Sequence, residues 1–194
     1  MEPSGLKGRD ANVFSASGSA LSVTSGRLSY TVGLVGPCYS IDTACASTLA
    51  ALHVCKVSVG LGECADGVGG GTKVLSEAMN LATSIGGMTS SRGRCHTFDS
   101  RADGYCRGEG CGMFFVSSGN SDSLTVGATF LGSALQQDGP SASLTAPNGL
   151  SQVRLIQAVR RSSRGGVYCD ESLEAHGTGT ALGDPIEVPC QDII

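Results

Sequence analysis

Residues 44–59, ACASTLAALHVCKVSV, are apolar on nearly every side of the helix that they predict. A helix of this kind is buried by neighbouring elements and has no polar face for solvent. The segments on either side of it, residues 38–42 and 64–72, are short and strand-like, and the second ends in glycines that predict a turn. Strands that flank a buried helix predict an α/β domain.

The rest of the chain continues this alternation of helices and strands. Asp42 and Thr43 are suitable caps for the 44–59 helix, and Asn148 is a suitable cap for a basic amphipathic helix that runs to about Arg164. The other expected elements are a helix over residues 18–32, strands over residues 109–118, 123–135 and 172–175, and a last helix that begins at Pro185.

Few residues carry charge, which excludes several classes of protein. The chain has 13 Lys and Arg, 17 Asp and Glu, and 40% hydrophobic residues, a balance that disordered chains do not have. Its net charge of −4 argues against nucleic-acid binding, and it has no run of about 18 apolar residues for a membrane span. A surface with so few charges is expected to be covered by further chain or by a partner, which favours an internal piece of a larger protein.

The first residues, MEPSGLKGRD, hold no apolar core of a secretory signal. We therefore expect an intracellular protein, in the cytoplasm or a plastid, whose cysteines are reduced. The nine cysteines include no CxxC pair, so a zinc site is not expected. Most of the cysteines are expected to be small buried side chains.

Cys45 departs from that expectation because it lies where a short strand meets the start of the 44–59 helix. The free N–H groups at a helix start stabilise an anion and so favour a reactive thiolate. His176 is the candidate partner, since its flanking glycines leave room for a ligand, whereas His53 and His96 are expected to be structural. A cysteine and a histidine form a nucleophile-and-base pair. Their order also fits papain-like proteases, but the DTACAS context lacks the motif of that family.

The glycine-rich segments 67–72 and 107–112 match neither the dinucleotide-binding motif nor the P-loop, so tight turns and close packing explain them better. Charge gathers in residues 98–110, FDSRADGYCRGEG. Four residues there are expected to pair with one another in an ordered loop: Arg101, Asp103, Arg107 and Glu109.

Four segments in order, DTACAS, FDSRADGYCRGEGCG, SLTAPNGLSQ and EAHGTGTALGDPIEV, resemble the ketosynthase domain of type I polyketide synthases. The upstream segment SGRLSYTVGLVGP adds to the resemblance, which extends over about residues 12–188. It implies the β-ketoacyl synthase family and a thiolase-like α/β fold with α-β-α-β-α layers. The implied domain is incomplete over residues 1–194, because N-terminal strands and a C-terminal part are missing.

The resemblance also implies roles for individual residues. Cys45 would accept an acyl group as a thioester, with its own backbone N–H as the first donor to the thioester oxygen. His176 would assist decarboxylation of a malonyl-type extender and stabilise the resulting enolate. Thr178 and Thr180 would bind the phosphopantetheine arm of an acyl carrier protein, and Glu187 would pair with a lysine further on. No cofactor would bind directly, and the domain would form a homodimer.

The same resemblance places a second histidine, that lysine and the second oxyanion-hole donor beyond residue 194. The chain alone is expected to be poorly soluble or inactive, because exposed strand edges and apolar surface invite aggregation. Ala46 stands where the family commonly has Ser, and Cys106 where it commonly has Val. Two other functions stay open. One is a ketosynthase of fatty-acid synthesis, and the other is a non-catalytic, ketosynthase-like structural subunit, which usually lacks the nucleophilic cysteine.

Overall fold

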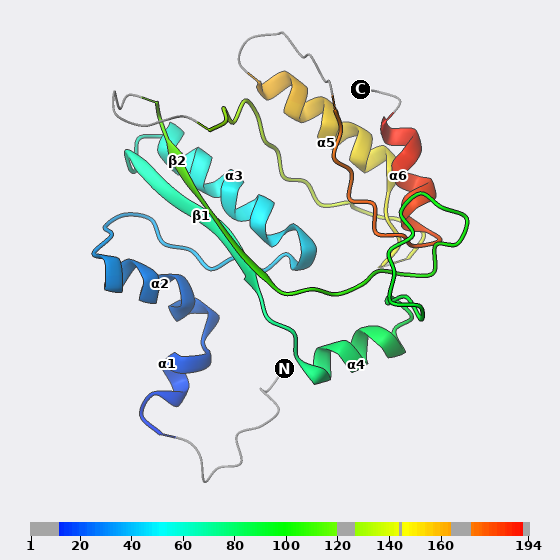
Figure 1. Ribbon diagram of the computed structural model, residues 1–194. Helices are drawn as coiled ribbons and strands as arrows, with labels where there is room; N and C mark the ends of the chain where they lie inside the picture. Colours follow the sequence, from blue (N-terminus) through cyan, green and yellow to red (C-terminus); the bar gives the residue numbers. More distant parts are fainter. Residues whose placement is uncertain (1–11, 120–126, 144, 164–171, 192–194) are drawn as a thin grey trace. The chain divides into compact units, whose positions relative to one another are not determined.

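The computed structural model describes residues 12–119, 127–143, 145–163 and 172–191 (Figure 1). The chain divides into two compact units. The first unit contains the described residues up to Gly71 and those from Gly112 to residue 119. The second contains Thr72–Cys111 and the described residues from 127 onward.

The first unit contains helices α1 (Ser15–Ser19) and α2 (Leu21–Val32), the 3₁₀ turn η1 (Ala44–Ala46), and helix α3 (Ser47–Gly60). It also contains most of strands β1 (Asp66–Lys73) and β2 (Gly110–Ser117), which pair in a two-stranded sheet (Figure 1). These elements confirm the predicted helices over residues 18–32 and 44–59. They also confirm the predicted strands over residues 64–72 and 109–118.

Alternate glycines of β1 allow α3 to pack directly against this strand. Side chains along a strand alternate between its faces, so Gly67, Gly69 and Gly71 share one face. A Cβ added at Gly67 would lie 2.6 Å from Cys55 Sγ, and one added at Gly71 would collide with Thr48 Oγ1. The glycines therefore continue the strand and bring the helix close to it, so the predicted glycine turn at the end of this strand is wrong.

The prediction that α3 is buried on all sides is wrong for this chain. Ala50 is buried, but Leu49 on the same helix is 68% exposed. Among the described residues, Ala50 and Cys190 are the only buried apolar side chains, and Phe115 of β2 is 59% exposed. A helix needs covering layers on every side to be buried. In the described part of this unit, β1 covers the glycine-contacting face of α3, and Leu49 remains in contact with solvent.

The second unit contains helices α4 (Glu77–Ile85), α5 (Gly149–Ser162) and α6 (Gly183–Gln191), and α5 packs against α6 (Figure 1). Asn148 caps α5 as predicted, because its Oδ1 accepts the Ser151 N–H at 3.3 Å. Helix α6 begins at Gly183, and Pro185, the predicted start, lies in its first turn. No helix in the described ranges combines the length and apolarity needed to cross a membrane.

Three predicted strands do not form in the residues that the structure describes: residues 38–42, 127–135 and 172–175. Residues 123–126, where the second of them was expected to begin, lie outside the described residues. A strand needs a neighbouring strand to accept and donate its backbone hydrogen bonds. In the described ranges, strands β1 and β2 pair with each other, and the three segments predicted as strands have no regular secondary structure.

Candidate active site

Cys45 is the middle residue of η1, the turn that leads directly into α3, and its side chain is exposed. The residue before it, Ala44, has a φ of +53°. This left-handed conformation costs a residue with a Cβ about 1–2 kcal/mol, and it persists only where surrounding contacts hold it. The turn therefore presents the thiol beside the N-terminus of α3, where backbone N–H groups favour an anion.

Two side chains hold this turn in place. Asp42 Oδ1 accepts the Ala44 N–H at 3.1 Å, which confirms Asp42 as a capping residue. Ser47 Oγ accepts the Thr43 N–H at 2.9 Å and donates to the Ala44 carbonyl at 2.8 Å. The side-chain cap expected from Thr43 is not formed within the described residues, and Ser47 supplies the second cap instead. The sequence offered a signal for Ser47, because serine is a preferred residue at helix starts.

The backbone at His176 is held by Glu187 from α6. Glu187 Oε1 accepts the His176 N–H at 2.5 Å, and Oε2 accepts the Gly177 N–H at 2.8 Å. A carboxylate that binds two successive N–H groups fixes the backbone in both position and direction. The His176 side chain itself is exposed, so a ligand can reach its imidazole ring.

A second loop, residues 95–106, packs against residues 176–180; we call them the bracing loop and the histidine loop. The Thr97 hydroxyl donates to the Gly177 carbonyl at 2.6 Å. Gly177 has a φ of +53°, and a Cβ added there would lie 2.6 Å from Thr97 Cγ2. Position 177 therefore requires glycine both for its backbone conformation and for this close approach.

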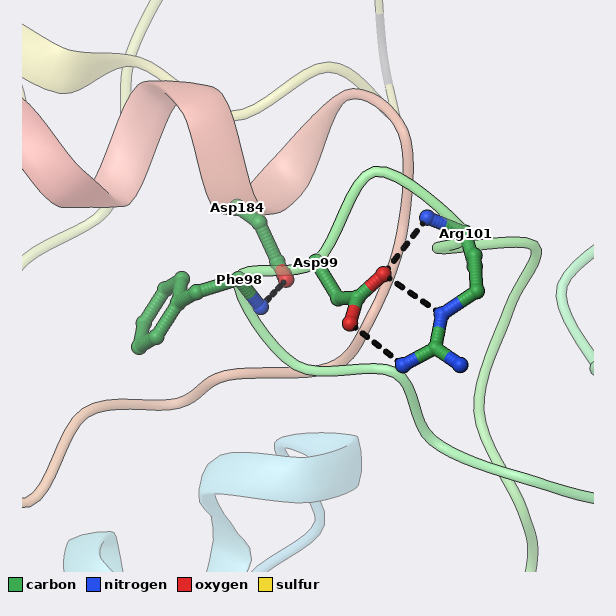
Figure 2. A network of polar contacts seen from close by, with 4 residues as sticks. All are labelled: Phe98, Asp99, Arg101 and Asp184. Carbon is green, nitrogen blue, oxygen red and sulfur yellow. Dashed lines mark hydrogen bonds and ion pairs between the residues drawn. The ribbon is translucent and has the colours of Figure 1, made fainter.

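Asp184, in the first turn of α6, connects the two loops. Its side chain is only 4% exposed. Its Oδ2 accepts the Phe98 N–H at 2.7 Å (Figure 2), and its Oδ1 accepts the Gly179 N–H at 3.0 Å. A Cβ added at Gly179 would lie 2.9 Å from the backbone nitrogen of His96. The bracing loop therefore fills the space beside Gly177 and Gly179, and the expectation that these two glycines leave room for a ligand is wrong.

The four charged residues predicted to pair with one another have other partners: Arg101, Asp103, Arg107 and Glu109. The Arg101 side chain donates to Asp99 at 2.7 Å from Nη2 to Oδ2 and 2.9 Å from Nε to Oδ1, and its backbone N–H donates to Asp99 Oδ1 at 2.9 Å (Figure 2). These hydrogen bonds hold the pKa of the Asp99 carboxyl well below its usual range. Asp103 accepts a hydrogen bond from Ser90 Oγ at 2.6 Å, which lowers the pKa of its carboxyl as well.

Two charged residues of the predicted cluster bind neutral groups in and before α4. Arg107 donates to the Met79 carbonyl at 3.4 Å and to Thr83 Oγ1 at 3.3 Å, and Glu109 Oε1 accepts the Leu75 N–H at 2.7 Å. The loop is ordered, as expected, but through hydrogen bonds to backbone and hydroxyl groups. An exposed ion pair contributes little to stability, so hydrogen bonds to backbone and hydroxyl groups compete well with charge pairing in this segment.

Thr178 and Thr180 lie on the histidine loop with half-buried side chains. Their hydroxyl oxygens are 3.1 Å apart, and Thr180 Oγ1 also accepts the Gly183 N–H at 3.0 Å. The second unit thus brings four predicted residues together around one loop: His176, Thr178, Thr180 and Glu187. Cys45 belongs to the first unit.

The expectation that most cysteines are buried is wrong for the part of the chain that the structure describes. Five of these thiols are exposed: Cys38, Cys45, Cys95, Cys106 and Cys111. Cys190 is buried, and burial raises the pKa of its thiol. Cys169 lies outside the described residues. Exposed thiols are open to chemistry that buried thiols do not undergo.

Comparison with known proteins shows the family. Residues 3–121 match the N-terminal domain of β-ketoacyl synthases, and residues 127–191 match the C-terminal domain. The chain belongs to the β-ketoacyl synthase family. The resemblance to this family is therefore confirmed over most of the sequence.

Its curated relatives include large polyketide synthases. The chain is 42% identical over 190 residues to polyketide synthase GfsB of Streptomyces halstedii, covering 95% of this chain and 3% of that protein. It is 43% identical over 183 residues to the phenolphthiocerol synthesis polyketide synthase type I Pks15/1 of Mycobacterium bovis, covering 90% of this chain and 8% of that protein. The chain thus spans only a small part of the length of these relatives.

Solved structures of ketosynthases share the fold. The ketosynthase from module 6 of the bacillaene synthase of Bacillus subtilis 168 superposes with a TM-score of 0.84 at 30% identity. The oxazolomycin ketosynthase domain OzmH KS7 of Streptomyces albus JA3453 superposes with a TM-score of 0.83 at 34% identity. Each comparison covers 90% of this chain and 32% of the solved one. The predicted thiolase-like α/β fold is confirmed, and the chain spans about a third of these ketosynthases.

Sequence reasoning missed two residues that shape the histidine loop. Asp184 precedes a proline in the first turn of a helix, a position where an acidic residue is typical, so a signal for it was present. Thr97 had no such signal, because its bond to Gly177 joins segments 80 positions apart in the sequence.

Proposed function

We propose that this chain carries the acyl-accepting cysteine and one catalytic histidine of a polyketide synthase ketosynthase, and that residues 1–194 are part of one such domain. The observation that carries the proposal is the exposed Cys45 on the strained η1 turn at the start of α3. The family and the similarity to polyketide synthases support it. The reaction class is decarboxylative condensation of carrier-bound acyl groups.

In the first step, the Cys45 thiolate attacks the carbonyl carbon of an acyl thioester on an acyl carrier protein. A C–S bond to Cys45 forms, and the phosphopantetheine thiol leaves. In the second step, a malonyl-type extender loses CO₂, and the resulting enolate carbon attacks the Cys45 thioester. A C–C bond forms and the Cys45 thiolate is released. The N–H groups at the start of α3 suit the oxyanion of both attacks.

His176 would donate a hydrogen bond to the enolate oxygen. Preorganised donors are effective because they need no rearrangement when charge develops. The two carboxylate contacts from Glu187 to the backbone at His176, and the contacts from the bracing loop, give this kind of rigidity. Thr178 and Thr180 would hydrogen-bond the phosphopantetheine arm, and Glu187 would pair with a lysine beyond residue 194.

The proposed partners are an acyl carrier protein and a second copy of the domain, with no cofactor bound directly and an intracellular location. Exposed apolar side chains of the first unit, such as Leu21 and Phe115, support a surface that is covered in the complete protein. For the same reason, we expect the isolated chain to be poorly soluble or inactive. Function in fatty-acid synthesis, or as a non-catalytic structural protein, remains the alternative.

A covalent probe tests the nucleophile. The complete protein is incubated with an acyl thioester or a cerulenin-type epoxide, and the labelled residue is identified by peptide mass spectrometry. We expect the label on Cys45, its loss in Cys45→Ala, and its retention in Cys38→Ala, which removes another exposed thiol of the same unit. Labelling that persists in Cys45→Ala would overturn the assignment.

A further inference from the structure

Two exposed cysteines of the bracing loop are in direct contact. The Cys106 N–H donates to Cys95 Sγ at 3.0 Å, although the two residues are 11 positions apart. A Cβ placed on Gly93 would lie 4.0 Å from Cys106 Sγ, so the Cys106 thiol lies close to the turn that leads into Cys95. Both side chains are exposed, and both residues belong to the second unit.

This contact fits the geometry of a disulfide. Because an N–Cα bond is about 1.46 Å long, Cys95 Sγ lies at most about 4.5 Å from Cys106 Cα. A disulfide joins Cα atoms that are about 4.4–6.8 Å apart, which places each sulfur within this reach of the opposite Cα. Because Cys95 Sγ already lies this close to the backbone of Cys106, we expect rotation of both side chains, with a small movement of the backbone, to bring the two sulfurs to bonding distance.

The backbone around the two cysteines is already fixed. Ser90 N–H donates to the Tyr105 carbonyl at 3.0 Å, and Tyr105 N–H donates to the Met88 carbonyl at 3.1 Å. The Ser90 hydroxyl in turn accepts the Arg94 N–H at 3.4 Å. The residues next to Cys95 and Cys106 are thus held beside each other by contacts that do not involve sulfur.

We propose that Cys95 and Cys106 are a redox-active pair that forms a disulfide and closes the bracing loop into a ring. The oxidant is a small-molecule disulfide of the glutathione type. One thiolate of the pair attacks a sulfur of the oxidant and releases one thiol. The second thiolate attacks the resulting mixed disulfide and releases the other thiol. The protein loses two electrons and two protons, and the small disulfide is reduced to two thiols.

Closing this ring would act on the histidine loop. The ring contains Thr97, which donates to Gly177, and Phe98, which donates to Asp184. It also contains Gly104, whose N–H donates to the Gly179 carbonyl at 2.9 Å. Opening of the bracing loop breaks all three contacts, and a covalent ring restricts that opening. The redox state of the pair would therefore set how often the histidine loop loses its support.

Peptide mapping tests the bond directly. The complete protein is equilibrated with glutathione disulfide, its remaining thiols are alkylated, and it is digested with trypsin. Because arginine stands at positions 94, 101 and 107, the digest separates residues 95–101 from residues 102–107. We expect these two peptides to be linked, two hydrogens lighter than their sum, and to separate on reduction.

Matched variants make the result specific. The linked pair should be absent from Cys106→Val and should persist in Cys111→Ser, which removes a neighbouring exposed thiol. In the wild-type protein, oxidation should slow hydrogen exchange over residues 176–180. The largest expected effect is about 100-fold, because this is the most that closing a ring of this size can stabilise the closed loop. Exchange should not slow in Cys106→Val. Recovery of both cysteines in separate glutathione-modified or alkylated peptides would overturn the pair, and unchanged exchange would overturn its action on the histidine loop.

Discussion

Removal of the Asp184 carboxylate tests how the histidine loop is held. Its two oxygens accept the Phe98 N–H at 2.7 Å and the Gly179 N–H at 3.0 Å, and the side chain is only 4% exposed. A hydrogen bond to a charged group contributes about 1.5–3 kcal/mol, and a buried donor left without an acceptor costs a similar amount. With two donors affected, we expect Asp184→Ala to destabilise the contact between the two loops by about 3–4 kcal/mol.

Hydrogen exchange of the complete protein, followed by mass spectrometry, measures this effect locally. Because each 1.4 kcal/mol is a factor of ten, the amides of residues 177–180 should exchange about 100 to 1000 times faster in Asp184→Ala. Asp184→Asn keeps the shape of the side chain and one acceptor oxygen, so its effect should be intermediate. Asp99→Ala is the matched control, since this carboxylate lies on the bracing loop and binds the exposed Arg101.

Two results would refute this reasoning. Exchange over residues 177–180 that is unchanged in Asp184→Ala would mean that the carboxylate does not support the histidine loop. An equal acceleration in Asp99→Ala and Asp184→Ala would mean that any loosening of the bracing loop has the same consequence, whatever the hydrogen bonds of Asp184.

Two further predictions concern the same loops. Gly177→Ala should lower the rate of condensation by the complete protein, because the added Cβ would lie 2.6 Å from Thr97 Cγ2. A second substitution, Thr97→Ser, removes that methyl group and keeps the hydroxyl, so the double variant should recover part of the rate. No recovery would contradict the steric explanation. The pKa values of the Asp99 and Asp103 carboxyls are lowered in the folded loop. The ionised carboxyls therefore stabilise the folded loop fully above about pH 3.9, the pKa of Asp in an unfolded chain, and this stabilisation is lost as the pH falls below that value. Proteolytic cleavage within residues 95–106, measured by an acid-tolerant protease from pH 6 to pH 3, should therefore increase as the pH falls, and cleavage that decreases would contradict the assignment.

The sequence predicted local structure well where one segment contains its own signals. The 149–162 helix was predicted because Asn148 stands before an amphipathic run, and the Asn148 cap is observed. Of the two explanations expected for the glycines of β1, close packing is confirmed and the turn is wrong, because the reason for these glycines lies in another segment. Gly67 and Gly71 are glycine because Cys55 and Thr48 of α3 occupy the space beside them. Nothing in the local sequence distinguishes such a glycine from one that forms a turn.

Strands were the least predictable elements for a related reason. Residues 38–42 and 127–135 are apolar and rich enough in β-formers to predict strands, but a strand exists only beside another strand. In the described ranges, β1 and β2 pair with each other, so the other segments have no regular partner. The layered thiolase-like fold is supported by the family and by the solved ketosynthases. These solved chains are about three times longer than the part that this chain covers.

The candidate residues of the site were selected from the sequence by their chemistry, and only part of the contacts that support them was predicted. Cys45 and His176 could be selected because few residue types act as nucleophile or base. The support comes from carboxylates that accept backbone N–H groups, as Asp42 does at Ala44 and Glu187 does at His176. Sequence alone favoured pairing acidic residues with basic ones, since it does not show which N–H groups are left without partners.

The same contacts explain how a chain with few charges keeps its loops ordered. Several of its acidic residues bind backbone N–H groups of loops and helix starts: Asp42, Asp99, Glu109, Asp138, Asp184 and Glu187. Arg101 and Asp99 form an ion pair that is exposed on the Arg101 side. A buried N–H group without an acceptor is costly, whereas an exposed ion pair contributes little. The Asp184 contact with Gly179 is buried and the Glu187 contact with Gly177 is half-buried, so these two carboxylates, which act on the loop that carries His176, are expected to affect stability more than the exposed contacts do.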